Sequence, residues 1–215
     1  MTRRAVAILA ALLVAAAPAP VPGPMPGYVR VRLVTSVGAI VVALDARRAP
    51  RTTANFLTYV DDGRFDDTRF YRASRRQAAP AFGFIQGGID TEAPRSLDPI
   101  PIERTDRTGI HHLDGTISMA HGPSANSATG NFSIMVGPTP SLDAYGANAG
   151  YAAFGHVVAG MDVVKRILAV PTGGGFDAMK GQMILAPIPI LRAERLDGAP
   201  HPSGRFKTWL VFRKQ

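Results

Sequence analysis

The stretch SMAHGPSANSATGNFSIMVG, residues 118–137, places two apolar runs on either side of a polar segment. Residues 117–120 and 132–136 have the composition of short buried strands, whereas the eleven residues between them are almost all small, polar or turn-forming. A connection of that length is too long for a tight hairpin and too polar for a core. The pattern predicts two strands joined by a long surface loop.

Short apolar runs of the same kind continue outward from this stretch in both directions. Toward the N-terminus, Val29, Val31 and Leu33 alternate with arginines, as in a strand with one wet face. Residues 39–44 are apolar throughout, as in a strand buried on both faces. Further strands are predicted at residues 68–72, 83–86, 152–157 and 183–196.

Two segments have helical spacing instead. Residues 49–60 carry Pro50, which suits the first turn of a helix. Residues 161–168 carry Asp162 near the start and two basic residues near the end, as the helix dipole favours. Many short strands with only two helices favour a mainly β fold, a closed antiparallel barrel of about eight strands capped by two α-helices.

The composition is that of a globular chain. The 215 residues are 46% hydrophobic, which is enough for one domain with a sizeable core. The absence of cysteine excludes disulfides, a thiol nucleophile and a lipid-modified cysteine. The net charge of +8 comes from largely scattered arginines without an aromatic-interleaved patch, so we expect a solvated basic surface and no nucleic-acid partner.

The N-terminus has the pattern of a leader. Arg3 and Arg4 precede thirteen apolar residues, 5–17, whereas a membrane span needs about 20. An uncleaved anchor is the alternative, because Pro18 and Pro20 crowd the cleavage sites after Ala17 and Ala19. We therefore divide the chain into a signal peptide at 1–19, a Pro/Gly linker at 20–28, a barrel domain at 29–197 and a basic tail at 198–215.

Six short motifs carry a resemblance to a known family. They are APRTTANFL (49–57), FYR (70–72), FIQGGID (84–90), GTISMA (115–120), NFSIMVG (131–137) and FGHVVAGMDVV (154–164). Their order and approximate spacing resemble those of the cyclophilin family of peptidyl-prolyl isomerases, and most closely its exported bacterial branch. The resemblance covers about residues 29–195.

The resemblance implies a function and a set of site residues. It implies an enzyme that catalyses cis/trans rotation about X-Pro bonds with no cofactor or metal, and Arg72 as its catalytic residue. The proposed partners are proline-containing segments of unfolded or exported proteins; we expect a periplasmic monomer that meets a membrane only through an uncleaved leader. The implied substrate-binding residues are Phe82, Phe84, Gln86, Ala120, His121, Asn131, Leu142 and Tyr151.

The chain also departs from the family pattern around the site. Six more residues than usual separate Arg72 from Gln86, which leaves the register of 73–85 open and lets Arg75 or Arg76 compete as the donor. Where the family has a glutamine, a pocket phenylalanine and often a tryptophan before leucine, this chain has Asn131, Ser133 and Ser141. A weaker or differently selective prolyl pocket is predicted.

Other functions remain as alternatives. The thinned pocket also fits a cyclophilin-fold module that binds peptide, as a chaperone does, with weak or no isomerase activity. Ser118, Asp143 and His156 supply the residue types of a serine hydrolase, but no G-x-S-x-G elbow surrounds them. His111, His112 and His121 lack carboxylates or cysteines at ligand spacing, so we predict no metal site. TGGGFDAMKG, residues 172–181, is interpreted as a connection between the second helix and the last strand.

Overall fold

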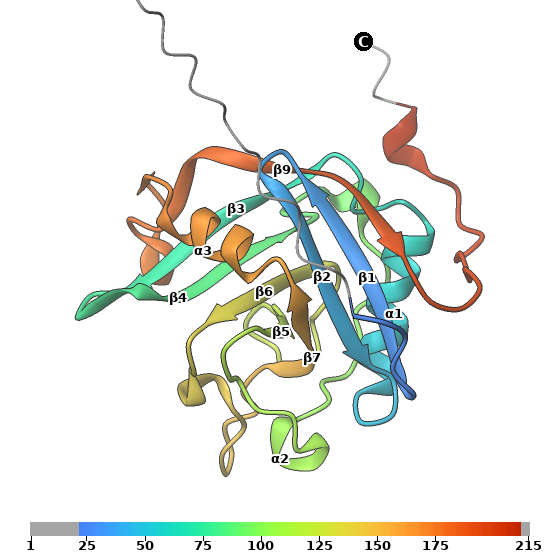
Figure 1. Ribbon diagram of the computed structural model, residues 1–215, viewed down its shortest axis with the longest axis horizontal. Helices are drawn as coiled ribbons and strands as arrows, with labels where there is room; N and C mark the ends of the chain where they lie inside the picture. Colours follow the sequence, from blue (N-terminus) through green and yellow to red (C-terminus); the bar gives the residue numbers. More distant parts are fainter. Residues whose placement is uncertain (1–21, 212–215) are drawn as a thin grey trace, which may run out of the picture.

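A computed structural model describes residues 22–211, so the predicted leader lies outside the described residues. Eight strands form a closed antiparallel barrel in which each pairs with two neighbours, in the order β1-β2-β7-β5-β6-β4-β3-β9 and back to β1 (Figure 1). Their bounds are β1 Tyr28–Thr35, β2 Gly38–Asp45, β3 Thr68–Arg76, β4 Ala79–Gly88, β5 Thr116–Met119, β6 Asn131–Val136, β7 Ala152–Ala159 and β9 Met183–Arg195. The two-residue strand β8, Thr172–Gly173, adds to β9. The predicted barrel is confirmed.

Two main helices pack on the barrel, as predicted. Helix α1, Pro50–Asp61, begins with the proline and contacts β2, β7 and β9. Helix α3, Met161–Ala169, contacts β2, β3, β4 and β6. No helix among residues 22–211 is long and apolar enough to cross a membrane. The short elements are α2 Thr105–Thr108 and the 3-10 turns η1 Ala93–Arg95, η2 Pro140–Leu142, η3 Asp177–Met179 and η4 Thr208–Leu210.

The core is centred on an aromatic cluster beneath α1. The ring of Phe56 lies 4.9 Å from that of Phe65, 5.3 Å from that of Phe132 and 5.4 Å from that of Phe154, centroid to centroid. All four side chains are fully buried. Because these residues come from the helix, the segment before β3, β6 and β7, one cluster ties the helix to the barrel wall that also carries the candidate site.

The six additional residues between Arg72 and Gln86 lengthen the β3–β4 hairpin. Pairing extends to Arg76 opposite Ala79, with irregularities after Phe70 and between Arg75 and Arg76. Gly83 has a φ of +148°, and a Cβ there would lie 1.9 Å from the carbonyl oxygen of Ser74, so only glycine fits. The register left open by the sequence is thereby set, with Arg72 opposite Gln86.

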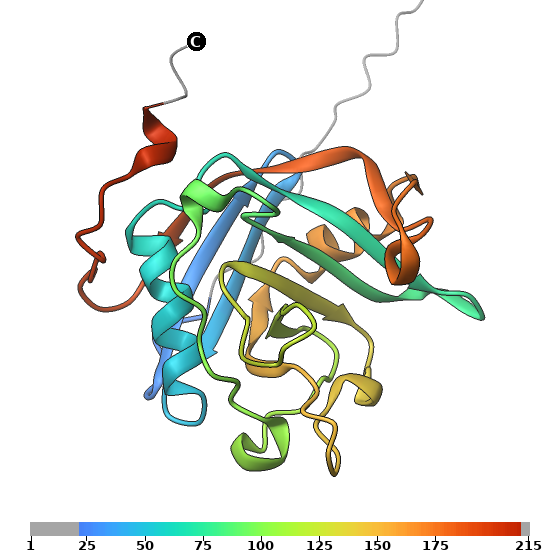
Figure 2. The same ribbon diagram turned by 180° about the vertical axis from the view of Figure 1, so that it is seen from behind.

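The segment after β9 is held against the end of α1 and the η1 region. Residues 198–211 pass beside α1 (Figures 1 and 2), where the backbone N–H of His201 donates to Asp61 and that of Ser203 to Asp62. Trp209 is 6% exposed, and its ring lies 4.6 Å from the guanidinium carbon of Arg64. The tryptophan therefore covers a buried arginine.

Candidate active site

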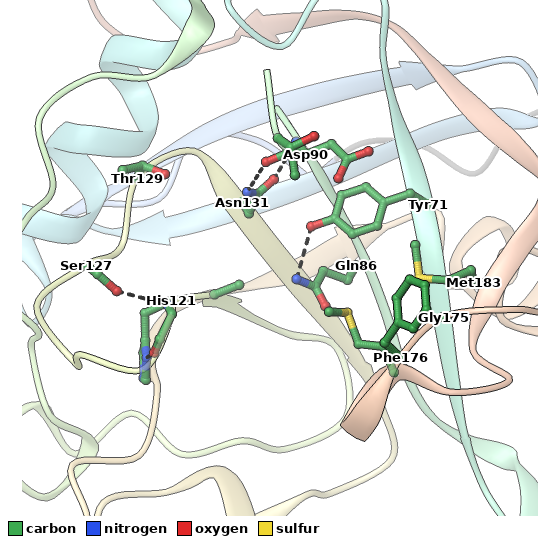
Figure 3. A pocket seen from close by; sticks show the side chains of 14 residues that line it. Tyr71, Gln86, Asp90, His121, Ser127, Thr129, Asn131, Gly175, Phe176 and Met183 are labelled. Carbon is green, nitrogen blue, oxygen red and sulfur yellow. Dashed lines mark hydrogen bonds between the residues drawn. The ribbon is translucent and has the colours of Figure 1, made fainter. Parts of the chain in front are cut away.

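Two adjoining hollows open between the polar loop after β5 and the segment before β9. The smaller, of about 280 Å³, brings together seven of the nine site residues expected from the sequence. These are Arg72, Phe84, Gln86, Ala120, His121, Leu142 and Tyr151. The larger, of about 630 Å³, shares three of them and adds Asn131. Figure 3 shows this larger hollow, with Tyr71, Phe176 and Met183 on one side and His121 and Ser127 on the other.

Arg72 lies within strand β3, just after the irregularity that follows Phe70. Its guanidinium is held from two sides. Its Nη1 donates to Oε1 of Gln86 at 2.9 Å, while Nε and Nη2 donate to Oε1 of Gln182 at 2.9 and 2.7 Å. Burial lowers the pKa of Arg72, yet a guanidinium keeps its charge in proteins. The site therefore offers a fixed cation at the edge of a hollow.

Gln86 has a defined amide orientation. Its Oε1 accepts from Arg72, and its Nε2 donates to the hydroxyl of Tyr71 at 3.0 Å (Figure 3). Burial raises the pKa of Tyr71 above its ordinary value, so that side chain stays a neutral hydroxyl. The chain Tyr71–Gln86–Arg72 thus links both hollows.

The two candidate phenylalanines lie in different places. The guanidinium carbon of Arg72 is 5.1 Å from the centroid of Phe84, whose ring lines the smaller hollow. Phe82 lies outside both hollows, 44% exposed, with its ring close to Gly137 and to the guanidinium of Arg76. Phe82 lies outside the hollows because it belongs to the lengthened part of the β3–β4 hairpin, together with Arg76.

Neither neighbouring arginine reaches the hollows. Arg75 turns the other way, and its Nη1 donates to the carbonyl oxygens of Leu168 at 2.9 Å and Val170 at 2.8 Å, at the end of α3. Arg76 donates to Thr139 at 3.1 Å. Competition with Arg72 for the donor role, which the sequence left open, does not arise in this geometry.

The loop between β5 and β6 is fixed at both ends. Its first residue, Ala120, donates its backbone N–H to the carbonyl oxygen of Asn131 at 2.9 Å. The ring of His121 stacks on that of Tyr151 at 4.4 Å, and its Nε2 lies 2.9 Å from the carbonyl oxygen of Gly150. Ala120 and His121 therefore form a wall shared by the two hollows.

Asn131 uses its amide inside the protein. Its Nδ2 donates to the carbonyl oxygen of Asp90 and its Oδ1 accepts from the Asp90 backbone N–H, both at 2.8 Å (Figure 3). This reciprocal pair ties the end of β4 to the start of β6. Asn131 therefore contributes to the larger hollow through its position, while its main polar contacts are already made.

A hydrogen-bonded Ser–His–Asp chain reaches the floor of the smaller hollow, and its histidine is His112 and not the His156 considered in the hydrolase alternative. Nε2 of His112 lies 2.8 Å from Oγ of Ser118, and its Nδ1 lies 2.6 Å from Oδ1 of Asp143. His156 instead lies edge-on to Tyr28, so the grouping with His156 is wrong. Ser118 sits within β5, paired on both sides, and not on the exposed turn that a hydrolase nucleophile needs.

The three histidines that were considered as metal ligands do not all face one point. His111 and His112 both face Asp143, whereas His121 faces Tyr151. Within residues 22–211 no three histidine or acidic side chains gather in a way that could hold an ion. Burial lowers the pKa of His112, which keeps it neutral beside Asp143.

Sequence reasoning missed the second partner of Arg72. Ala178 belongs to residues 172–181, which were interpreted as a connection, and Gln182 follows that segment directly; both contact the guanidinium. Phe176, Met179 and Met183 from the same region line the larger hollow. Gln182 stands 110 positions from Arg72, and no local pattern marks the pairing.

Solved structures with the same architecture define the class of fold. A cyclophilin type peptidyl-prolyl cis-trans isomerase from Cryptosporidium parvum matches with a TM-score of 0.61 and 21% identity, over 80% of this chain and 99% of that one. Cyclophilin AquaCyp293 from Hirschia baltica matches with a TM-score of 0.60 and 20% identity, over 80% and 75%. The barrel is therefore a cyclophilin fold.

The sequence carries the assignment further. The family described as "Cyclophilin type peptidyl-prolyl cis-trans isomerase/CLD" matches residues 30–195. Peptidyl-prolyl cis-trans isomerase A of Dickeya dadantii is 37% identical over 142 residues, 66% of this chain and 72% of the relative; isomerase B of Escherichia coli is 33% identical over 142 residues, 65% and 84%. This chain belongs to the cyclophilin-type peptidyl-prolyl cis-trans isomerases.

Proposed function

We propose that Arg72 is the catalytic residue and that the smaller hollow receives the proline ring. An amide bond resists rotation by ~18–20 kcal/mol because the nitrogen lone pair is shared with the carbonyl. In the twisted state the proline nitrogen regains that lone pair and can accept a hydrogen bond. A donor fixed beside the ring therefore favours the twisted state over either planar isomer.

The geometry around Arg72 supports this role. The guanidinium is anchored by Gln86 and Gln182, and the apolar side chains of Phe84, Met119 and Leu142 line the hollow beside it. No bond need be broken, so a donor and an apolar site for the ring are sufficient. The single observation that carries the proposal is this cation, held by two glutamines at the edge of a hollow.

Proline-containing segments are the proposed substrates. The related Cryptosporidium parvum enzyme, 20% identical and with a TM-score of 0.63, was crystallised in the presence of the dipeptide Ala-Pro. In this chain the wall formed by Ala120 and His121 lies next to Gln86, where an extended peptide can be gripped on both sides of the ring.

We further propose that the clients are exported proteins and that the enzyme works in the periplasm, as a member of the exported bacterial branch. The support is the sequence pattern at 1–19, two arginines followed by an apolar run shorter than a membrane span. Cell fractionation with N-terminal sequencing of the mature chain tests this. A cytoplasmic protein that retains residue 1 would refute it.

A second candidate function is peptide holding with slow turnover. The observation that favours it is the polar floor of the smaller hollow, where Ser133 lies opposite Ser118 across the β5–β6 pair. A floor without an aromatic side chain loses apolar contact with the ring, worth about 1.5–3 kcal/mol. In that case the chain suppresses aggregation of an unfolded protein while Arg72→Ala has no effect on prolyl exchange.

A protease-coupled isomerisation assay on an Ala-Pro tetrapeptide tests the catalytic assignment. Wild type is expected to accelerate exchange, and Arg72→Ala to lose at least 100-fold in kcat/KM. Arg76→Ala, at the tip of the hairpin, is the matched control and is expected to keep wild-type activity. Equal losses in both variants, or none in Arg72→Ala, would refute the role of Arg72.

A further inference from the structure

The segment 174–182 between β8 and β9 is a closed, internally bonded excursion of the chain. The N–H of Gly181 donates to the carbonyl oxygen of Gly174 at 2.5 Å and closes its ends. Within it, the N–H of Gln182 donates to Met179 at 3.0 Å. Gly174 and Gly181 have φ values of +57° and +77°, which favour glycine. The segment is therefore a defined structure and not a loose connection.

Gln182 is bound to strand β3 through both its side chain and its backbone. Its Oε1 accepts from Nε and Nη2 of Arg72 at 2.9 and 2.7 Å, and its backbone carbonyl accepts from the N–H of Ala73 at 2.9 Å. Its Nε2 donates to the carbonyl oxygen of Ala178 at 2.9 Å, which fixes the amide with the oxygen toward Arg72. The glutamine is thus a preset acceptor for one edge of the guanidinium.

Counting donors shows what this arrangement leaves free. A guanidinium has five N–H groups. The Nε–H goes to Gln182, the two Nη2–H groups to Gln182 and the carbonyl oxygen of Ala178 at 3.3 Å, and one Nη1–H to Gln86. Among residues 22–211, the contacts of the group leave one Nη1–H for a substrate, on the nitrogen that lies on the Gln86 side.

We propose that Gln182 is a positioning residue, which orients the Arg72 guanidinium so that its remaining Nη1–H faces the proline nitrogen. The inference rests on the proposed catalytic role of Arg72. Without Gln182, the guanidinium would keep the bond from Nη1 to Gln86 and the longer bond, of 3.3 Å, from Nη2 to the carbonyl oxygen of Ala178, and it would be free to turn about the side-chain bonds that precede it. Gln182 holds the opposite edge at two nitrogens, which fixes the plane as well as the position.

The principal test is Gln182→Met, which keeps an unbranched side chain of similar length and removes the acceptor. We expect kcat for the Ala-Pro tetrapeptide to fall about five- to twentyfold, with KM within about twofold of wild type, because the hollow is unchanged while the donor is misaligned. Gln182→Glu restores an acceptor and is expected to recover kcat to within about threefold of wild type. Lys180→Ala, exposed on the same segment, is the matched control and is expected to match wild type.

A spectroscopic readout separates positioning from a general structural effect. The side-chain Nε–H resonance of Arg72 in a ¹⁵N-labelled sample is expected to exchange slowly with water in wild type and fast in Gln182→Met. Unchanged kcat, or unchanged Nε–H exchange, in Gln182→Met would overturn the proposal. A fall in kcat that Gln182→Glu does not reverse would overturn it too.

The double variant distinguishes this inference from the assignment of Arg72 itself. If Gln182 acts only through Arg72, Gln182→Met adds no further loss to Arg72→Ala. If Arg72→Ala retains wild-type kcat, the proposed catalytic role has failed. If Arg72→Ala is inactive and Gln182→Met is fully active, the catalytic role stands and the positioning role has failed.

Discussion

Replacing Ser133 by phenylalanine should strengthen substrate binding. Ser133 pairs with Gln86 on one side and Ser118 on the other, so the three side chains lie in a row at the floor of the smaller hollow. A phenyl group there would add roughly 60–100 Å² of apolar contact with a bound proline ring, worth ~1.5–2.5 kcal/mol. Because ring contact is similar in the planar and twisted states, KM is expected to fall about tenfold or more while kcat changes little.

The assay is the steady-state isomerisation rate over a range of Ala-Pro tetrapeptide concentrations, with Ser133→Ala as the control. The alanine variant removes the hydroxyl without adding a wall, and its KM is expected to stay within about twofold of wild type. Thermal unfolding of both variants verifies that the hollow remains folded. A folded Ser133→Phe enzyme whose KM is unchanged or higher would show that the ring does not occupy this hollow.

Further predictions concern stability and the hairpin. Burial lowers the pKa of His112, so the unfolded state takes up a proton at this histidine at a higher pH than the folded state does. The contribution of neutral His112 to stability is therefore full above about pH 6.5 and falls as the pH decreases. The free energy of unfolding in urea, measured at pH 7.5 and 5.0, should depend less on pH in His112→Asn than in wild type. Trp209→Ala should lower the free energy of unfolding by about 2–4 kcal/mol in urea titration, because it uncovers Arg64; an unchanged midpoint would contradict the docking of the tail. Gly83→Ala should lower the melting temperature by several degrees, as its Cβ meets the Ser74 carbonyl. Phe82→Ala should leave kcat/KM within twofold; a tenfold loss would place Phe82 in the site.

The barrel could be predicted because its signals are local. Alternation at Val29, Val31 and Leu33 predicts β1, and Pro50 marks the start of α1, as the structure has them. The same alternation also predicts a wet face for Arg30, which is instead 8% exposed because its guanidinium pairs with Asp197 at 2.7 Å. A partner 167 positions away leaves no trace in a period-two pattern.

In the site, too, local sequence signals could be predicted and contacts between distant residues could not. The family resemblance implied both Arg72 and Gln86 as site residues, and the structure places them opposite each other on neighbouring strands. Phe82 was expected in the site together with Phe84. The additional residues of the hairpin are visible in the sequence, but the irregularity between Arg75 and Arg76 is not, so the register of 73–85 stayed open. The contacts of His112 with Ser118 and of Gln182 with Arg72 form only when the barrel closes. Residue type and spacing therefore could not distinguish His112 from His156, or Gln182 from an ordinary loop glutamine.

The central claim is that Arg72 acts on the rotating bond and not only on binding. NMR exchange spectroscopy of an Ala-Pro peptide, at protein concentrations that saturate the peptide, measures both the rate of bond rotation and the binding of the peptide in one sample. The account predicts cis/trans exchange cross-peaks with wild type and none with Arg72→Ala, although the peptide shifts still report binding to the variant. Exchange at the wild-type rate in Arg72→Ala would contradict it.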